Sequence, residues 1–469
     1  MVFSSAVFLF FFLPLVLLIY YFANPRFRNI ILLIFSLFFY AWGEPTFVLL
    51  MIVSIFVNYL IALIINKPKM KKISLILLAV FNLSFFFIFK YLNFTLLNLN
   101  KYIFSNSLPQ THIMLPIGIS FFTFQAISYV LDVSRGRGKV QKNPLNVALY
   151  ISFFPQLIAG PIVRYETVAA EINLRHENIS DFSRGIQRFV VGLGKKVILS
   201  NTVAVLADYV FSSVSISAMS VTMAWVGIIS YTMQIYFDFS GYSDMAIGLG
   251  LMFGFHFDEN FDYPYISKSV SEFWRRWHIS LGTWFRDYVY FPLGGSRVAG
   301  KKRLIWNLFV VWSLTGIWHG ANWTFVLWGL FYFVLLTFEK LTNIPKRFKT
   351  KIAKVFYRVF TIICIIIGWV IFRSDSIQHA FQYTMRMFGI GGVPFSDSVS
   401  LFLIKDNFGV LLLCTLFSTP LLTNLLNKLL NKHIMLKSVL VILGVVTLFV
   451  LSAAYIVNSS YNPFIYFNF

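Results

Sequence analysis

Long apolar runs separated by short polar segments dominate the chain. They recur at roughly 16–22 residues, close to the ~20 residues that an α-helix needs to cross a bilayer. The runs cover residues 2–22, 29–42, 46–65, 73–93, 113–131, 186–212, 221–238, 304–319, 322–340, 354–373, 407–427 and 438–457. The pattern predicts an all-α, polytopic membrane protein with about 11–12 transmembrane helices.

Basic residues alternate from loop to loop along these runs. Lys and Arg concentrate in cytoplasmic loops of membrane proteins, so the basic loops should share the cytoplasmic side. Their basic residues are Arg26, Arg28, Lys67, Lys69, Lys71, Lys72, Arg135, Arg137, Lys139, Lys142, Lys340, Lys346, Arg347, Lys349 and Lys351. The loops at 43–45, 94–112 and 374–406 are poorer in Lys and Arg. This alternation places both termini outside the cytoplasm.

Two stretches fit no simple crossing, residues 143–185 and 239–303. The first is apolar but is interrupted by Pro155, Gly160 and Pro161. Irregular backbone at membrane depth persists only where protein or a water-filled cavity covers it. We therefore expect re-entrant or interfacial helices around a central site. The whole chain, 1–469, is predicted to be one membrane-embedded domain with an outer tail at 458–469.

The composition supports a membrane protein and excludes several other classes. Hydrophobic residues make up 58% of the chain and charged residues 12%, whereas soluble proteins carry about 25% charged residues. The net charge is +21, and most of the basic residues lie in the loops between the apolar runs. The charge therefore indicates membrane topology and not a nucleic-acid partner. Cys364 and Cys414 stand singly in apolar runs without the spacing of a metal site, as expected for buried, inert thiols.

His319 lies in the apolar sequence "WSLTGIWHGANW". It comes about 24 Å along a span that starts after the basic Arg303, so it is expected inside the membrane. Ionisable side chains there are costly and usually functional, although a neutral histidine hydrogen-bonded between helices is the alternative. Gly316 and Gly320 flank it and allow another backbone or a substrate to come close.

His278 lies in "EFWRRWHISLGTWFRD", which holds several aromatic residues and three arginines, Arg275, Arg276 and Arg286. One interpretation is an interfacial amphipathic helix whose arginines reach toward the membrane surface. The other is a cytoplasmic gate where the arginines meet an anionic, phosphate-bearing substrate.

Asp132, Asp238 and Asp244 border apolar runs. They would be ion or proton sites in a transporter, but helix capping or pairing with nearby arginines is the favoured interpretation. The sequence "HENISD" matches a short acyltransferase pattern, yet it stands in a polar loop without supporting motifs and is interpreted as a chance match.

With these segments in view, the chain resembles the membrane-bound O-acyltransferase family, in its bacterial alginate O-acetyltransferase branch. The similar stretches include "AGPIVRYE", "YFDFSGYSDMAIGLGLMFGF", "NFDYPYISKSVSEFWRRWHISLGTWFRDYVYFPLGG" and "GIWHGANWTFVLWG". The last two contain the paired histidines of the family, here His278 and His319.

The resemblance implies a bacterial cytoplasmic-membrane enzyme that moves acetyl across the membrane to a cell-surface or secreted polysaccharide. Acetyl-CoA would be the donor substrate, with no tightly bound cofactor and no metal. An extracytoplasmic SGNH-like acetyltransferase would be the partner, beside the glycan acceptor and membrane lipids. His319 would be the general base, His278 would line the donor channel, and Asn322 would orient the imidazole or stabilise an oxyanion.

The aromatic C-terminus "YNPFIYFNF" carries Tyr466. Its resemblance to similar endings implies an acyl relay, whereas an interfacial aromatic anchor is the alternative. Arg275, Arg276 and Arg286 would attract the CoA phosphates or serve topology alone. A D-alanyl, lipid or protein O-acyltransferase of the same family, and a polytopic transporter or flippase, are the competing functions.

Overall fold

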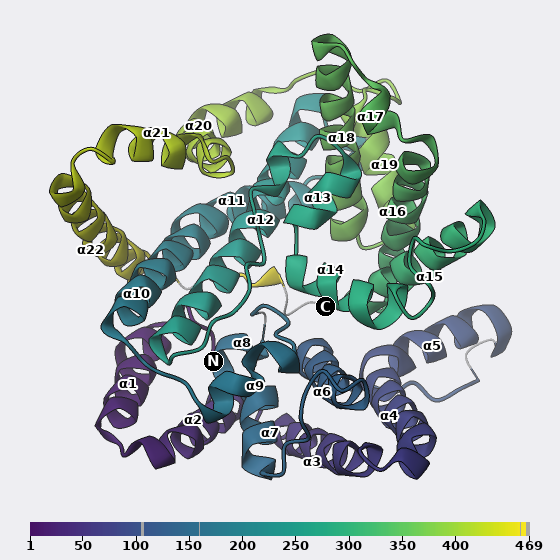
Figure 1. The fold of residues 1–469 in the computed structure, drawn as a ribbon. Coiled ribbons are helices and arrows are strands. Elements are labelled where there is room, and N and C mark those ends of the chain that lie inside the picture. The colour runs from purple at the N-terminus through teal and green to yellow at the C-terminus, as the bar shows by residue number, and fades with distance from the viewer. Residues whose placement is uncertain (105–106, 159, 460, 466–469) are drawn as a thin grey trace. The chain divides into compact units, whose positions relative to one another are not determined.

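The structure is a computed structural model that describes residues 1–104, 107–158, 160–459 and 461–465. The described part is built of helices (Figure 1). Its backbone hydrogen-bond pattern contains no β-strand. The prediction of an all-α fold is therefore confirmed.

The helices form two compact units, each built from two separate stretches of sequence. The first unit comprises Met1–Phe189 and Tyr242–Asp258, and the second comprises Val190–Gly241 and Glu259–Phe469. The prediction of a single membrane-embedded domain over 1–469 stays a prediction.

The first unit contains nine complete α-helices among the described residues: α1 (Leu13–Phe22), α2 (Arg28–Gly43), α3 (Phe47–Ile65), α4 (Lys71–Phe86), α5 (Leu92–Leu99), α6 (Ile119–Ser134), α7 (Pro144–Ser152), α8 (Phe154–Leu157) and α9 (Tyr165–Asn173). Two helices contribute residues to both units: α10 (Ile179–Gly194) and α12 (Val221–Met252).

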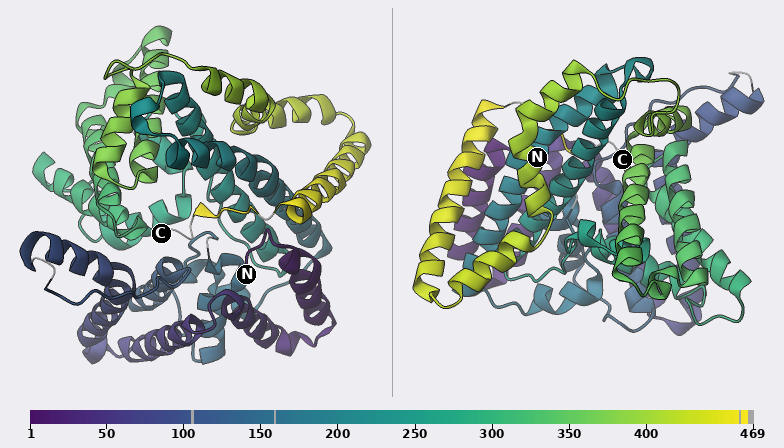
Figure 2. Two further views of the ribbon diagram at one scale, coloured as in Figure 1. Left: turned by 180° about the vertical axis from the view of Figure 1, so that it is seen from behind. Right: turned by 90° about the horizontal axis from the view of Figure 1, so that it is seen from above.

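The second unit contains, in its described part, α11 (Asn201–Asp208), α13 (Val270–Arg276), α14 (Ile279–Phe285), α15 (Lys301–His319), α16 (Trp323–Thr342), α17 (Ile344–Arg347), α18 (Lys351–Arg373), α19 (Ile377–Met387), α20 (Ser398–Phe417), α21 (Leu421–Leu430) and α22 (Ile434–Asn458). Figure 2 shows α22, in yellow, alongside the segment Lys195–Ser200 that follows α10, where Leu448 packs on Gly194.

Among the described residues, eight helical segments are long and apolar enough to cross a membrane. They are Pro25–Gly43, Phe47–Ile65, Pro68–Phe104, Ile179–Ser213, Trp323–Thr342, Lys351–Arg373, Ser398–Phe417 and Ile434–Asn458. Phe8–Phe22 and Ile119–Ser134 are shorter apolar helices. The polytopic prediction is confirmed, with fewer qualifying spans than the expected 11–12. The runs at 221–238 and 304–319 form parts of α12 and α15, which are not among the eight.

Several predicted boundaries are wrong. The sequence "GYSDMAIGLG" was expected in an irregular stretch, but it continues α12 to Met252. Its glycines fit a helix because they face other backbones closely: a Cβ on Gly248 would lie 2.6 Å from the Gly185 carbonyl oxygen. The predicted run 407–427 instead begins at Ser398, where Asp397 and Ser400 form a capping box, and ends before Pro420. The expected loop 94–112 is helical as far as Phe104.

The broken stretches at 143–185 and 253–303 do form short helices. Asn143 caps α7, and Pro155 lies in the first turn of the four-residue α8. In the second unit, α13 and α14 have seven residues each and meet at His278. These lengths are too short to cross a bilayer.

Helices α15 and α16 form a hairpin in the second unit and pack backbone to backbone. A Cβ on Gly316 would lie 2.5 Å from the Phe325 carbonyl oxygen, and one on Gly329 would lie 2.4 Å from that of Trp312. Glycine at these two positions therefore lets the backbones touch, as in tightly packed membrane helices. The close approach that was predicted for Gly316 is to a backbone.

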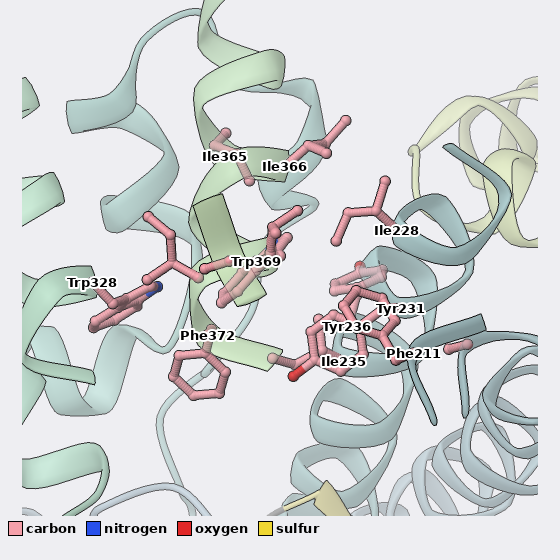
Figure 3. Close-up of a cluster of buried hydrophobic side chains, with 14 of the residues drawn as sticks. Phe211, Ile228, Tyr231, Ile235, Tyr236, Trp328, Ile365, Ile366, Trp369 and Phe372 are labelled. Atoms are coloured by element: carbon pink, nitrogen blue, oxygen red, sulfur yellow. The ribbon is translucent and has the colours of Figure 1, made fainter. Parts of the chain in front are cut away.

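An aromatic core joins α16 to α18 and α12. Figure 3 shows Trp328, Trp369 and Phe372 directed toward one another, with Tyr231 and Tyr236 of α12 nearby. The Trp328 and Phe372 rings lie 5.3 Å apart in an edge-to-face arrangement. Such pairs add about 0.5–1.5 kcal/mol beyond the burial of their surface.

Gly316→Val should destabilise this hairpin because its side chain would overlap the α16 backbone. We expect a loss of about 1–3 kcal/mol or more and a lower midpoint of thermal unfolding in detergent. Gly409→Val on α20 is the matched control, since nothing lies within 4 Å of its Cβ position. Equal thermal midpoints for the two variants would contradict this account of the hairpin.

Candidate active site

His319 is the last residue of α15 and lies among aromatic side chains. It is 5% exposed. Its ring centroid lies 4.9 Å from those of Trp318 and Trp328 and 5.2 Å from that of Phe372, each nearly perpendicular to it. Gly320 follows, where any Cβ would meet the Phe325 ring at 2.2 Å. The imidazole is thus held at the end of a helix inside the aromatic core.

His278 lies between α13 and α14 in the left-handed region, with a φ of 47°, and is 2% exposed. Asn260 Oδ1 accepts hydrogen bonds from the Ser280 N–H at 3.2 Å and the Ser280 hydroxyl at 2.9 Å. The same oxygen lies 3.1 Å from His278 Nδ1. An oxygen that accepts from two groups is an acceptor for the third, so we assign the proton of neutral His278 to Nδ1.

The other ring nitrogen of His278 is then an acceptor. Nε2 is buried and has no hydrogen-bond partner among the described residues. Burial also lowers the pKa of His278 well below its ordinary value, because a charged imidazolium is poorly solvated there. His278 therefore presents an uncharged nitrogen lone pair.

Glu339 holds the helix that leads to His278. Its carboxylate accepts hydrogen bonds from the backbone N–H groups of Val270 and Ser271, both at 2.8 Å, at the start of α13. Tyr357 donates to it at 2.7 Å. A carboxylate is favourable at a helix N-terminus because it pairs with free N–H groups. A role for Glu339 was not predicted from the sequence. A lone carboxylate at the end of an apolar run could have indicated one.

Trp318 brings the two histidines together. Its ring centroid lies 6.1 Å from that of His278 and 4.9 Å from that of His319. Residues 41 positions apart in the sequence thus contact one indole. The structure places the two predicted histidines in one site.

A cavity of about 450 Å³ reaches His278. Trp274, Leu281, Phe285, Leu308, Val311 and Trp312 give it apolar walls. Arg275, Arg286 and Lys340 also line it and are exposed. We call it the cationic cavity. Lys340 was predicted only as a topological residue. Arg276 is not among the lining residues; it pairs with Asp262 at 2.5 Å and Glu272 at 3.1 Å.

A second cavity, of about 550 Å³, lies by the C-terminal segment, and we call it the tail cavity. Its lining includes Asn322, Phe325, Phe372 and Arg373, with tail residues Asn462, Pro463, Phe464 and Ile465. Asn322 caps α16 by accepting from the Thr324 N–H at 3.1 Å, and its amide donates to the Asp375 carbonyl at 3.1 Å. Its side chain is thus engaged in structure, and its catalytic role stays a prediction.

The two cavities lie at opposite ends of α16. The cationic cavity includes Lys340 near the C-terminal end, and the tail cavity includes Asn322 at the N-cap. A helix of 20 residues measures about 30 Å, the thickness of a bilayer core. Thr315, which lines the cationic cavity, precedes His319 by one helical turn, and Phe372, which contacts His319, lines the tail cavity.

A buried ion pair anchors the tail. Lys196 Nζ lies 2.7 Å from Asp238 Oδ1, with both side chains 1% exposed. Lys196 also donates to the Pro463 carbonyl, and Asp238 Oδ2 accepts from the Ile465 N–H at 2.9 Å. Farther out, Asp208 bonds Tyr461 at 2.5 Å and Arg373 at 2.9 Å. Tyr466 lies outside the described residues.

Asp132, Asp238 and Asp244 were expected to cap helices or to pair with arginines, and pairing with an arginine is confirmed for Asp244. Asp238 pairs with Lys196, a lysine where an arginine was expected, and Asp244 pairs with Arg188 at 2.7 Å. Asp132 Oδ2 lies 3.4 Å from the Glu166 N–H.

Comparison with known proteins gives the family. The sequence profile of the membrane-bound O-acyltransferase family, MBOAT, matches residues 138–374. The chain belongs to this family. It is therefore a multi-pass membrane O-acyltransferase.

Curated relatives cover most of the chain. It is 44% identical to the probable alginate O-acetylase AlgI of Pseudomonas aeruginosa over 85% of this chain and 76% of that protein. It is 35% identical to the peptidoglycan O-acetyltransferase of Helicobacter pylori over 90% and 86% of the respective chains. The teichoic acid D-alanyltransferase of Bacillus subtilis is 29% identical over 58% of this chain and 72% of that protein.

Lys196→Met should destabilise the protein by about 3–5 kcal/mol, because it leaves Asp238 buried without its counter-charge. The double variant Lys196→Met/Asp238→Leu removes both charges and should unfold at a higher temperature than Lys196→Met alone. Thermal unfolding in detergent measures both. If the loss of stability in the double variant equals the sum of the losses in the two single variants, the pairing is contradicted.

Asn260→Leu should reduce acyl transfer strongly because Nδ1 of His278 loses its acceptor and the tautomer is no longer fixed. Asn260→Asp keeps an acceptor at that position, so it should retain more activity. The aspartate charge should raise the pKa of His278, so that His278 becomes protonated at a higher pH. The acidic limb of the pH–rate profile should therefore shift to higher pH. Rates measured across pH test both variants; identical profiles for Asn260→Asp and the wild type would contradict this role.

Proposed function

We propose that this O-acyltransferase moves acetyl from cytoplasmic acetyl-CoA across the membrane for O-acetylation of a cell-surface or secreted polysaccharide. The observation that carries the proposal is the histidine pair that contacts Trp318 between two cavities at opposite ends of α16. A donor in one cavity and an acceptor in the other would meet there.

The cationic cavity suits a coenzyme A thioester. Arg275, Arg286 and Lys340 offer three positive charges to phosphate groups, for which arginine is well shaped. The apolar walls beyond them suit a flexible pantetheine arm. The thioester carbonyl would then lie near His278, whose uncharged Nε2 could accept a hydrogen bond from an N–H group of the donor and so help to place it.

His319 is the proposed general base. Its imidazole takes the proton from the acceptor hydroxyl while that oxygen attacks the thioester carbonyl. The C–S bond then breaks, the thiolate leaves, and the imidazolium returns the proton to sulfur. The products are an oxygen ester and free CoA–SH. Asn322 is proposed to assist near the tail cavity, and no metal is needed in this scheme.

The relatives support a glycan as the final acceptor. Two of those named above carry O-acetylation of alginate or peptidoglycan in their names. We therefore propose an alginate-like or other glycan, reached through an extracytoplasmic SGNH-like acetyltransferase partner. D-alanyl transfer is the second candidate, because the chain is also similar to a teichoic acid D-alanyltransferase. In this scheme both termini lie outside the cytoplasm, and the tail cavity opens there.

His319→Ala should abolish surface O-acetylation while leaving protein level and membrane insertion unchanged. Loss of a general base lowers a rate by about 10²–10⁴-fold. Ester-linked acetate released from the cell surface by mild alkali measures the effect, with immunoblotting of membranes as the control. Normal acetylation in this variant would refute the proposed base.

Tyr466 is proposed to relay acetyl from the donor to the partner. The position of Ile465, the residue before Tyr466, supports the relay, because Ile465 lines the tail cavity and donates its N–H to Asp238. Tyr466→Phe removes only the hydroxyl and should sharply reduce surface acetylation. Tyr461→Phe, which removes a hydroxyl bound to Asp208, is the matched control. Undiminished acetylation in Tyr466→Phe would end the relay hypothesis.

A further inference from the structure

A polar cavity in the first unit shares no lining residue with the two cavities described above. Its volume is about 570 Å³, and it lies where α1 ends and α2 begins, beside α7 and the segment after α9. Its lining contains Arg26, Arg28 and Arg175 with the single carboxylate of Glu177. With histidine counted as neutral, these groups give the lining a net charge of +2.

Two of the three arginines of the cavity, Arg28 and Arg175, are held in fixed positions. Arg28 pairs with Glu177 at 2.9 Å, and the Tyr20 hydroxyl also donates to Glu177. Arg175 donates to Tyr20 at 2.9 Å and to Asn29 at 2.6 Å. Burial opposes ionisation of Glu177, but its hydrogen bonds and the two arginines outweigh burial and lower its pKa. The carboxylate is therefore charged. It pairs with both Arg28 and, at 3.4 Å, Arg175, so its one negative charge offsets one of the three positive charges.

A chain of amides builds the opposite wall. Asn29 donates to Asn146 at 3.2 Å, and Asn146 donates to Asn173 at 3.1 Å, which ties α2, α7 and α9 together. One buried donor is left over, because Arg28 Nε has no hydrogen-bond partner among the described residues. Preorganised cations, amides and a spare N–H group are suited to phosphate oxygens.

Apolar side chains stand next to this polar lining. Ile30 and Leu145 line the cavity and are themselves exposed. Leu174, between the lining residues Asn173 and Arg175, is 80% exposed. A soluble phosphate compound offers nothing to such side chains, whereas the acyl chains of a lipid do.

We propose that this cavity binds the phosphate headgroup of an anionic membrane phospholipid, with its acyl chains along Ile30, Leu145 and Leu174. Basic pockets beside membrane helices bind anionic headgroups in this way. The site lies at the end of apolar helices, where a headgroup would be found. It is independent of the acyl-transfer chemistry.

The test uses the purified full-length protein and native mass spectrometry. Short-chain phosphatidylglycerol should bind, and phosphatidylcholine of equal chain length should bind at least tenfold more weakly. Arg26→Gln removes an exposed charge whose side chain makes no described contact, and it should weaken phosphatidylglycerol binding about fivefold, the effect of about 1 kcal/mol per basic residue.

A second variant keeps the fold while adding charge. Asn143 caps α7 through its oxygen, and aspartate caps equally well, so Asn143→Asp should weaken lipid binding by a similar factor without loss of thermal stability. Arg137→Gln, an exposed arginine that does not line the cavity, should bind as the wild type.

Three results would overturn the proposal. One is equal binding of phosphatidylcholine. Another is displacement of the lipid by equimolar inorganic phosphate or glycerol 3-phosphate, which would identify a site for soluble phosphate. The third is unchanged lipid binding in both Arg26→Gln and Asn143→Asp.

Discussion

The contact between the backbones of α15 and α16 at Gly316 and Gly329 places the residues that the proposed chemistry uses. A side chain at either position would separate the helices. His319 ends α15 only one turn beyond Gly316, and Trp328 of α16, which packs on the imidazole, directly precedes Gly329. The hairpin therefore places His319 against the aromatic side chains around it. Helix α16 also contributes lining residues to both cavities, one at each of its ends.

Several buried polar groups of the second unit hold irregular segments of backbone in place. An unpaired polar group in an apolar interior costs several kcal/mol, so partners are required. Asn260 holds His278, Glu339 holds the start of α13, and the Lys196–Asp238 pair holds the tail backbone. These interactions hold backbone groups as well as side chains in position. The site is thus assembled from irregular segments that would be untenable in lipid without such partners.

The sequence predicted the all-α membrane fold and singled out His319 because their signals are local, whereas His278 was assigned to the site by the resemblance to the family. Apolar runs show the membrane helices directly in the sequence. An ionisable residue inside such a run stands out as a candidate functional residue. The course of α12 through "GYSDMAIGLG" could not be predicted, since its glycines are explained only by the backbones that face them. Asn260 and Glu339 were missed for the same reason: their partners lie 18 and 69 residues away in the sequence.

The tail shows the same limit. An aromatic C-terminus was visible in the sequence, and Asp238 was expected to pair with a charged neighbour. The ion pair of Lys196 and Asp238 also binds the backbone of Pro463 and Ile465. This contact could not be predicted from the sequence, because it depends on the fold. Lys340 likewise joins Arg275 and Arg286 at one cavity because α16 packs beside α13 and Lys340 donates to the Tyr290 hydroxyl.

The central claim is that the cationic cavity delivers a thioester to the histidine pair. A cryo-electron microscopy structure with a non-hydrolysable acetyl-CoA analogue tests it most directly. The account predicts phosphate density at Arg275, Arg286 and Lys340, and the acetyl group beside His278 and Trp318. An analogue bound in the tail cavity, or bound with its acetyl group away from both histidines, would contradict the account.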